Sequence, residues 1–100
     1  TLQKLGILVA TDEYPGCAKA LLQAARDAGV ETACFLTDAG VRVLTDPDFR
    51  ERAADSGSQV TVCEHSWERE ELGEPLSGYN FASQYQNAAM VGWADKVVVL

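Results

Sequence analysis

The chain has 100 residues, the size of one compact domain that buries roughly 60% of its unfolded surface. Its 8 basic and 15 acidic residues give a net charge of −7, and so negative a surface repels nucleic-acid phosphates and anionic lipid headgroups. No apolar run reaches the roughly 18 residues of a membrane span, and residues 1–10 lack the regions of a signal peptide. We therefore expect a single domain over residues 1–100, with neither nucleic acid nor membrane as a partner.

The cysteines are widely spaced, at positions 17, 34 and 63, with no CxxC pair and only 1 His in the chain. An odd number of unpaired cysteines argues against a disulfide framework, and the missing cluster of His and Cys ligands argues against a zinc site. Persistent thiols are typical of a reducing compartment, so we expect a cytoplasmic location and no metal cofactor.

Two strands and one helix are predicted in the first third of the chain. Residues 5–10 (LGILVA) form an almost continuous apolar run, which is typical of a strand covered on both faces. After the loop TDEYPG, apolar residues at helical spacing predict a helix over residues 16–28, ended by Gly29. Residues 31–36 (ETACFL) predict the second strand, and residues 37–40 (TDAG) carry turn chemistry.

A helix and a strand are predicted in the middle of the chain. Asp46 followed by Pro47 is typical of a helix start, so a second helix is predicted over residues 47–55. Residues 59–63 (QVTVC) predict the third strand. Residues 65–75 are polar and acidic without a clear period, and we interpret them as a loop or a frayed helix.

The last quarter of the chain repeats the alternation. Residues 79–81 predict a short strand, and Ser83 with Gln86 forms a capping box that opens a helix reaching Trp93. Residues 96–100 (KVVVL) predict the last strand. Alternating strands and helices predict a three-layer α/β domain with a mainly parallel sheet of about five strands and helices on both faces.

The predicted last helix is apolar on nearly every side. The residues expected to cover the sheet are Tyr85, Ala88, Ala89 and Gly92. The residues that extend the apolar surface around the helix are Met90, Val91, Trp93 and Ala94. In so small a domain another subunit is the expected cover, so we predict a homo-oligomer.

Topology selects the position of a candidate site. Ligands of open parallel sheets bind beyond the carboxyl ends of the strands, where the connections diverge. With a flavodoxin-like strand order of 2-1-3, residues 11–16 would face Cys63, which ends the third strand, across this crevice. Cys63 is therefore the first candidate nucleophile, and the alternative is a small apolar filler, because free cysteine is among the most buried residue types.

The residues that follow Cys63 act on its reactivity in both directions, because a nucleophilic thiol has to form the thiolate. His65 and Arg69 would lower its pKa if the loop folds back on the sulfur, although a lone His in a polar loop can equally be solvated. Nearby carboxylates would raise the pKa, and the chain has Glu64, Glu68, Glu70, Glu71 and Glu74.

Four further residues are weighed for the site. Cys17 lies in the first turn of the predicted first helix, where the helix dipole stabilises a thiolate, but it can equally begin the buried stripe of that helix. Cys34 lies inside the second strand and is expected to be structural. Thr11 and Tyr14 are candidates to line a small pocket, although their loop lacks the glycines and the basic residue of a phosphate-binding loop and a solvated loop is the alternative.

Four segments in order resemble the DsrE/DsrF family, which includes the TusD-type sulfur-relay subunits. They are LGILVATDEYPG, FLTDAGV, VTVC and SQYQNAAMVGWADKVVVL, and the resemblance spans nearly the whole chain. It implies a flavodoxin-like fold that assembles into trimers or hexamers of itself or related subunits. In the active relay subunits a cysteine at the end of strand three carries sulfur as a persulfide, and Cys63 occupies that position. The segment EHSWEREELGE after it departs from the small apolar and basic residues of those subunits.

The resemblance leaves the function open between relay and assembly. In sulfur relay, the Cys63 thiolate takes the terminal sulfur of a donor persulfide and yields it to the thiol of an acceptor protein, without a metal or organic cofactor. The alternative is a non-catalytic oligomeric assembly or interaction subunit, because the family also has members without the cysteine. A third hypothesis is a small-molecule or nucleotide site in the crevice beside Cys63.

Overall fold

Strands and helices alternate through residues 3–100, the part of the chain that the computed structural model describes. The elements are β1 (Lys4–Val9), α1 (Pro15–Asp27), β2 (Glu31–Leu36), a 3₁₀ helix (Asp38–Thr45), α2 (Pro47–Asp55), β3 (Gln59–Cys63), α3 (Glu64–Arg69), β4 (Asn80–Ala82), α4 (Gln84–Trp93) and β5 (Lys96–Val99). All strand pairs are parallel, so the predicted α/β class and parallel sheet are confirmed.

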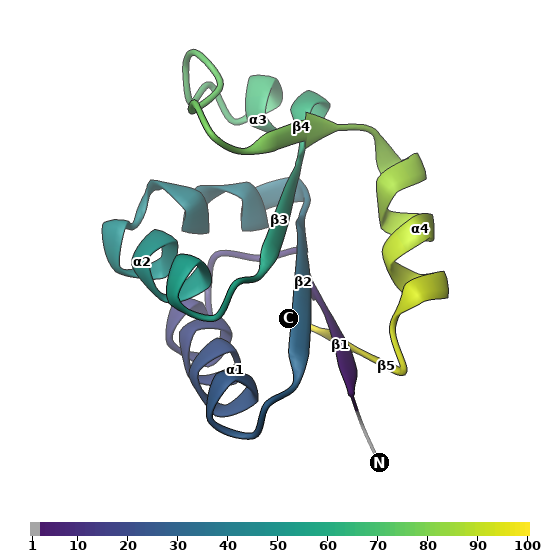
Figure 1. The fold of residues 1–100 in the computed structure, drawn as a ribbon. Helices are drawn as coiled ribbons and strands as arrows, with labels where there is room; N and C mark the ends of the chain where they lie inside the picture. The colour runs from purple at the N-terminus through teal and green to yellow at the C-terminus, as the bar shows by residue number, and fades with distance from the viewer. Residues whose placement is uncertain (1–2) are drawn as a thin grey trace.

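The order of the strands differs from the expected one. The sheet runs β4-β3-β2-β1-β5, so β2, and not β1, is the neighbour of β3 (Figure 1). Cys34 of β2 pairs with Ile7 of β1 on one side and with Val60 of β3 on the other. Alternation of strands and helices fixes the direction of the strands but not their neighbours, and the prediction of a 2-1-3 order was wrong for that reason. The end of β2 therefore separates the loops that follow β1 and β3.

Helices cover both faces of the sheet, with α1 and α2 on one face and α4 on the other (Figure 1). The larger core lies beneath α1 and α2, because alternate residues of each strand point to that face. Its fully buried side chains include Ile7, Leu22, Leu36, Phe49 and Val62.

The core between α4 and the sheet is the smaller of the two. Its buried residue is Met90, which packs in a small cluster with Ala33, Phe35 and Cys63. Tyr85, predicted to cover the sheet, is 77% exposed. The predicted face was wrong because apolar residues surround this helix, and such a pattern does not identify the buried side.

The predicted helix starts at Asp46 and Ser83 are confirmed. The Asp46 carboxylate accepts a hydrogen bond from the N–H of Asp48 at 2.9 Å, and the Ser83 hydroxyl accepts one from the N–H of Tyr85 at 3.3 Å. The residues expected as a loop or frayed helix, 65–75, form most of the short helix α3 and the loop after it, and α3 starts directly after β3. Cys63 therefore lies at a strand-to-helix junction.

A buried 3₁₀ helix, longer than the turn predicted at residues 37–40, connects β2 to α2. It buries Val41, Val43 and Leu44 against the core. Gly40 lies so close to the end of β1 that a methyl group there would overlap the carbonyl of Val9. This close approach fixes where the chain leaves β2, next to Cys63.

Candidate functional site

Cys63 ends β3 on the face of the sheet that α4 covers. The residue is only 6% exposed, but its side chain borders a cavity of about 330 Å³. Three connections meet around this cavity, namely residues 37–38 after β2, residues 63–66 and 69 at the start of α3, and residues 82–84 between β4 and α4. The cavity therefore lies at the carboxyl edge of the sheet, where the ligands of parallel sheets bind.

Four polar groups near Cys63 favour its thiolate form. They are the hydroxyl and the N–H of Ser66, the hydroxyl of Thr37 and the N–H of His65. Burial is the largest single influence on the pKa of the Cys63 thiol and raises it, but the four donors favour the thiolate and together outweigh burial. The pKa of Cys63 is lowered below its ordinary value as a result, as a nucleophilic thiol requires.

Neighbouring donors bind the oxygens of the two hydroxyls. Gln84 Nε2 donates to Thr37 Oγ1 at 2.9 Å, and the N–H of Asp38 donates to Ser66 Oγ at 2.9 Å. The two hydroxyl oxygens lie 3.5 Å apart. Because each oxygen already accepts a hydrogen bond, its own proton is available to donate to the sulfur.

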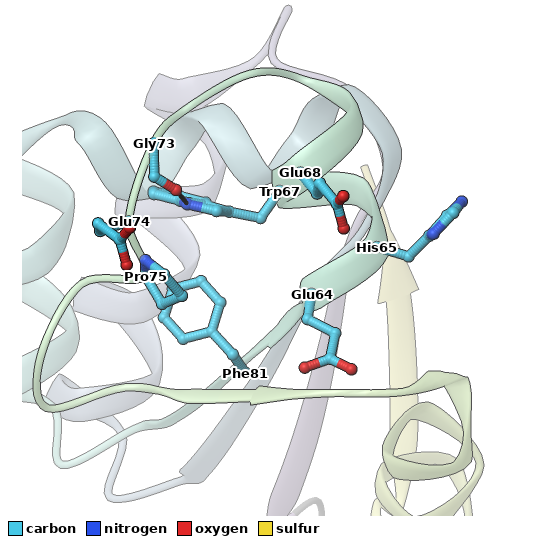
Figure 2. A pocket seen from close by; sticks show the side chains of 8 residues that line it. All are labelled: Glu64, His65, Trp67, Glu68, Gly73, Glu74, Pro75 and Phe81. Atoms are coloured by element: carbon cyan, nitrogen blue, oxygen red, sulfur yellow. Dashed lines mark hydrogen bonds between the residues drawn. The ribbon is translucent and has the colours of Figure 1, made fainter.

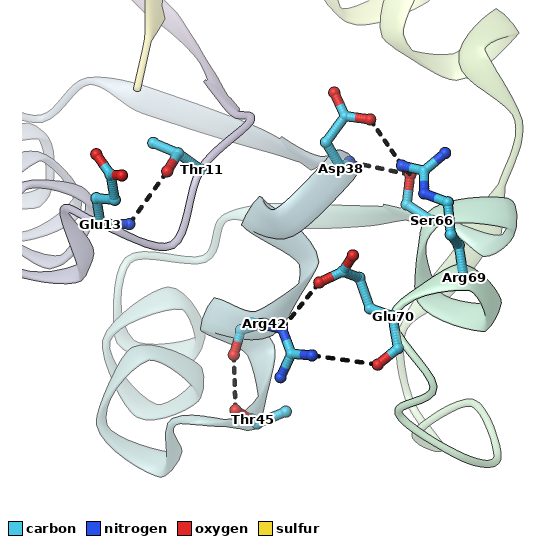
Figure 3. A network of polar contacts seen from close by, with 8 residues as sticks. All are labelled: Thr11, Glu13, Asp38, Arg42, Thr45, Ser66, Arg69 and Glu70. Atoms are coloured by element: carbon cyan, nitrogen blue, oxygen red, sulfur yellow. Dashed lines mark hydrogen bonds and ion pairs between the residues drawn. The ribbon is translucent and has the colours of Figure 1, made fainter.

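Asp38 ties the end of β2 to α3. Its φ of 49° lies in the left-handed region. Residues other than glycine rarely adopt this backbone conformation, although aspartate does so more often than most. Its carboxylate binds Arg69 at 2.8 Å, and Arg69 also approaches Ser66 Oγ at 3.5 Å (Figure 3). These contacts hold Ser66 in place beside Cys63.

Of the glutamates that follow Cys63, Glu64 borders the same cavity, whereas three others lie elsewhere. Glu70 pairs with Arg42 at 2.9 Å (Figure 3), and Glu68 and Glu74 line a separate cavity (Figure 2). Of the two opposite effects expected from this segment, the lowered pKa of Cys63 agrees with the one that favours the thiolate, and the polar groups that lower it outweigh burial.

The two basic residues expected near Cys63 both reach its surroundings. His65 acts on the sulfur through its backbone N–H. Its imidazole points away from Trp67 and Phe81 in Figure 2, although the residue borders the cavity at Cys63. Arg69 contacts the hydroxyl of Ser66, so its charge is placed one side chain away from the sulfur.

Three predicted site residues lie apart from Cys63. Thr11, Tyr14 and Cys17 follow β1, and β2 stands between them and β3. Thr11 accepts a hydrogen bond from the N–H of Glu13 at 3.3 Å, and Tyr14 is 53% exposed. Cys17 is exposed on α1, on the opposite side of the sheet from α4 (Figure 1). The crevice predicted between residues 11–16 and Cys63 is not formed, because it required the 2-1-3 strand order.

Cys34 is enclosed in the core, in the place expected for a structural residue. Burial raises the pKa of its thiol to about 11, against a smaller effect of the Ser58 hydroxyl 3.6 Å from its sulfur. Its thiol therefore stays protonated at neutral pH.

Sequence reasoning missed Thr37, Ser66 and Gln84. They come from three different connections, and only the β4-β3-β2 arrangement brings them together. Two of them could have been found from their positions in the sequence, because Thr37 directly follows β2 and Ser66 lies in the first turn after Cys63.

Residues 3–100 contain neither a metal-binding cluster nor a membrane-spanning helix. In this span no three His, Cys, Asp or Glu side chains are grouped so as to hold a metal ion. None of the helices within it is long and apolar enough to cross a membrane.

Comparison with known proteins gives a structural likeness. No protein-family model matches the chain, and no curated protein matches it. Among solved structures it is similar to the ychN protein of E. coli, with a TM-score of 0.69 and 14% identity over 100% of both chains. That protein has a DsrE/DsrF-like fold, and this chain shares its five-stranded parallel sheet flanked by helices. At this identity the likeness concerns the fold.

Proposed function

We propose that the chain carries sulfur as a persulfide on Cys63 and transfers it to the thiol of a partner protein. The observation that carries this proposal is the lowered pKa of a thiol that borders a cavity at the carboxyl edge of the sheet. The DsrE/DsrF-like fold and the four segments that resemble the sulfur-relay family support it.

Both steps of the transfer use the donors around Cys63. In loading, the Cys63 thiolate attacks the terminal sulfur of a donor persulfide; the donor's S–S bond breaks and the donor leaves as a thiolate. In delivery, an acceptor thiolate attacks that terminal sulfur, and its bond to Cys63 breaks. Ser66 and Thr37 then stabilise the departing Cys63 thiolate, and a thiol of low pKa leaves faster.

The cavity has room for this chemistry. Its volume of about 330 Å³ is several times the share of one water molecule, about 30 Å³ in the liquid. A terminal sulfur on Cys63 and the end of an incoming cysteine side chain fit in this space together.

Loading by sulfur donors tests the proposal. A Cys17→Ser protein, which keeps Cys63 and the buried Cys34, is incubated with a cysteine desulfurase and cysteine, or with a thiosulfate-loaded sulfurtransferase. Mass spectrometry should find the mass of one added sulfur atom on the peptide that contains Cys63, and none in Cys63→Ser. Failure of every donor to load Cys63 refutes the proposal.

A second proposed function is that of an oligomeric assembly subunit, favoured by apolar side chains exposed on α4 and β5. They are Tyr85 at 77%, Val91 at 50% and Val99 at 64% exposure. We propose that these residues contact further copies of the chain or related subunits in a trimer or hexamer. Val91→Glu should then lower the mass measured by light scattering, whereas Ala54→Glu on α2 should not. A monomer at every concentration contradicts the assembly.

The two functions differ in their need for the thiol. Cys63→Ser abolishes sulfur relay but leaves an assembly role intact, so a complementation assay with that variant distinguishes them. Both fit the cytoplasm, where Cys17, Cys34 and Cys63 remain free thiols.

A further inference from the structure

A second cavity adjoins the one at Cys63. It has a volume of about 590 Å³ and shares Glu64 and His65 with the Cys63 cavity. We call it the Trp67 cavity, and it is lined by Glu64, His65, Trp67, Glu68, Gly73, Glu74, Pro75 and Phe81 (Figure 2). Through the shared residues, a bound chain can reach both cavities at once.

The apolar floor of the Trp67 cavity is already formed. Trp67 and Phe81 meet edge to face, with ring centroids 5.2 Å apart and planes at 81°. The indole N–H of Trp67 donates to the carbonyl of Gly73 at 2.9 Å, which fixes the loop that brings Glu74 and Pro75 to the cavity. A ligand therefore meets a preorganised apolar surface.

Three carboxylates surround this floor. Glu64, Glu68 and Glu74 are exposed, and Figure 2 shows them around Trp67 and Phe81. The ion pairs found among residues 3–100 leave all three without a cationic partner. At the Cys63 cavity, by contrast, Arg69 is paired with the carboxylate of Asp38. The combined surface thus carries uncompensated negative charge.

Resting on the proposed function, we infer that the Trp67 cavity binds a lysine or arginine side chain of the protein segment that presents its sulfur to Cys63. The aliphatic stem of such a side chain packs on the apolar floor, and its cationic head meets the carboxylates of Glu64, Glu68 and Glu74. A small anionic donor is disfavoured by the same charges. The occupant is therefore a basic segment of a partner protein whose cysteine lies close in sequence to lysine or arginine.

The test uses a short peptide whose central cysteine is flanked by lysine and arginine and is activated as a mixed disulfide with thionitrobenzoate. The Cys63 thiolate attacks the peptide sulfur; the activated S–S bond breaks, a Cys63–peptide disulfide forms, and thionitrobenzoate leaves as a coloured thiolate. The reaction is followed in the full chain with Cys17→Ser. A peptide with glutamine in place of lysine and arginine is the reference.

We expect the basic peptide to react about tenfold faster than the reference at low ionic strength, and this advantage to shrink as salt is added. The triple variant Glu64→Gln, Glu68→Gln, Glu74→Gln should lose the advantage. A control triple variant at exposed acidic positions outside the cavity, Glu31→Gln, Glu51→Gln, Asp55→Asn, has the same net charge of −4, from −7 plus 3, and should keep it. An uncharged disulfide reagent normalises each variant for the intrinsic reactivity of Cys63.

Equal rates for the two peptides, or an equal loss in both triple variants, overturn the inference. Neither result decides whether Cys63 can be loaded with sulfur, so the proposed function would still stand. Conversely, a tenfold advantage of the basic peptide without any sulfur loading on Cys63 refutes the proposed function and not the binding site.

Discussion

Replacing Ser66 by alanine should make Cys63 a slower nucleophile at neutral pH. Among the donors on the sulfur, the Ser66 hydroxyl lowers the pKa of Cys63 most. Ser66 is only 2% exposed, and the N–H of Asp38 holds its oxygen at 2.9 Å. Alanine removes this hydroxyl and keeps the backbone N–H at the same position, so of the groups that lower the pKa of Cys63 only the Ser66 hydroxyl is lost.

The size of the effect follows from the energy of a hydrogen bond to a charged group. Such a bond contributes about 1.5–3 kcal/mol, and the remaining donors and water compensate for part of it. Since about 1.4 kcal/mol corresponds to a factor of ten, we expect the thiolate fraction at pH 7 to fall about tenfold. Folding stability should also fall by about 1–2 kcal/mol, because the N–H of Asp38 loses its acceptor.

The stability change should depend on pH. The lowered pKa of Cys63 adds to stability above the ordinary thiol pKa, and this contribution is lost as the pH falls through the lowered value. Ser66→Ala should therefore lose more stability at alkaline pH than at neutral pH, which denaturant titration at both pH values measures.

The assay for reactivity is alkylation of the Cys17→Ser protein by iodoacetamide, followed by mass spectrometry across a pH series. Ser66→Ala should shift the rate profile to higher pH. The matched control is Ser58→Ala, which removes a half-buried hydroxyl beside Cys34 and should leave the profile in place. A profile for Ser66→Ala that coincides with that of the parent refutes the assigned role of the donors.

Two further predictions concern stability. Burial raises the pKa of Cys34 from 9.0 to about 11, so the stability that its neutral thiol contributes is complete below pH 9 and is lost as the pH rises toward 11. Denaturation of the parent relative to Cys34→Ala should show a loss of about 1.4 kcal/mol per pH unit in that window, and parallel pH dependences would contradict it. Gly40→Ala should cost more than about 3 kcal/mol or prevent folding, because the methyl group overlaps the carbonyl of Val9. Gly16→Ala, with open space around the new methyl group and a helical position, should be neutral or stabilising by up to about 1 kcal/mol in thermal melts; equal costs at both positions would refute this reasoning.

The sequence predicted where helices and strands begin and end better than it predicted which of them lie side by side. Apolar runs and helical spacing identified both ends of β1, α1 and β3 to within one residue, because each signal is local. The order β4-β3-β2-β1-β5 depends on the direction that each connection takes over the sheet, which no local signal records. The sheet-facing side of α4 was misassigned for a related reason, since Met90 is distinguished by what it contacts and not by its type.

The candidate site shows the same division. Cys63 was identified because it ends a predicted strand, and that depends on residues 59–63 alone. Thr37 and Gln84 belong to connections far away in the sequence, so their place beside the sulfur follows only from the strand order. The charged residues that follow Cys63 in the sequence did not decide the direction of its pKa, because side-chain direction matters: Glu70 turns to Arg42, while the groups that lower the pKa are Ser66, Thr37 and the N–H of His65.

The most direct test of the central claim is a single-turnover transfer with radioactive sulfur. The Cys17→Ser protein is loaded from a labelled donor, separated from it and then mixed with a thiol acceptor protein that carries basic residues beside its cysteine. The label should first be found on Cys63, survive without reductant, and then pass to the acceptor with recovery of the free Cys63 thiol. A label that never binds Cys63, or that binds and cannot be transferred to any thiol, contradicts sulfur relay by this chain.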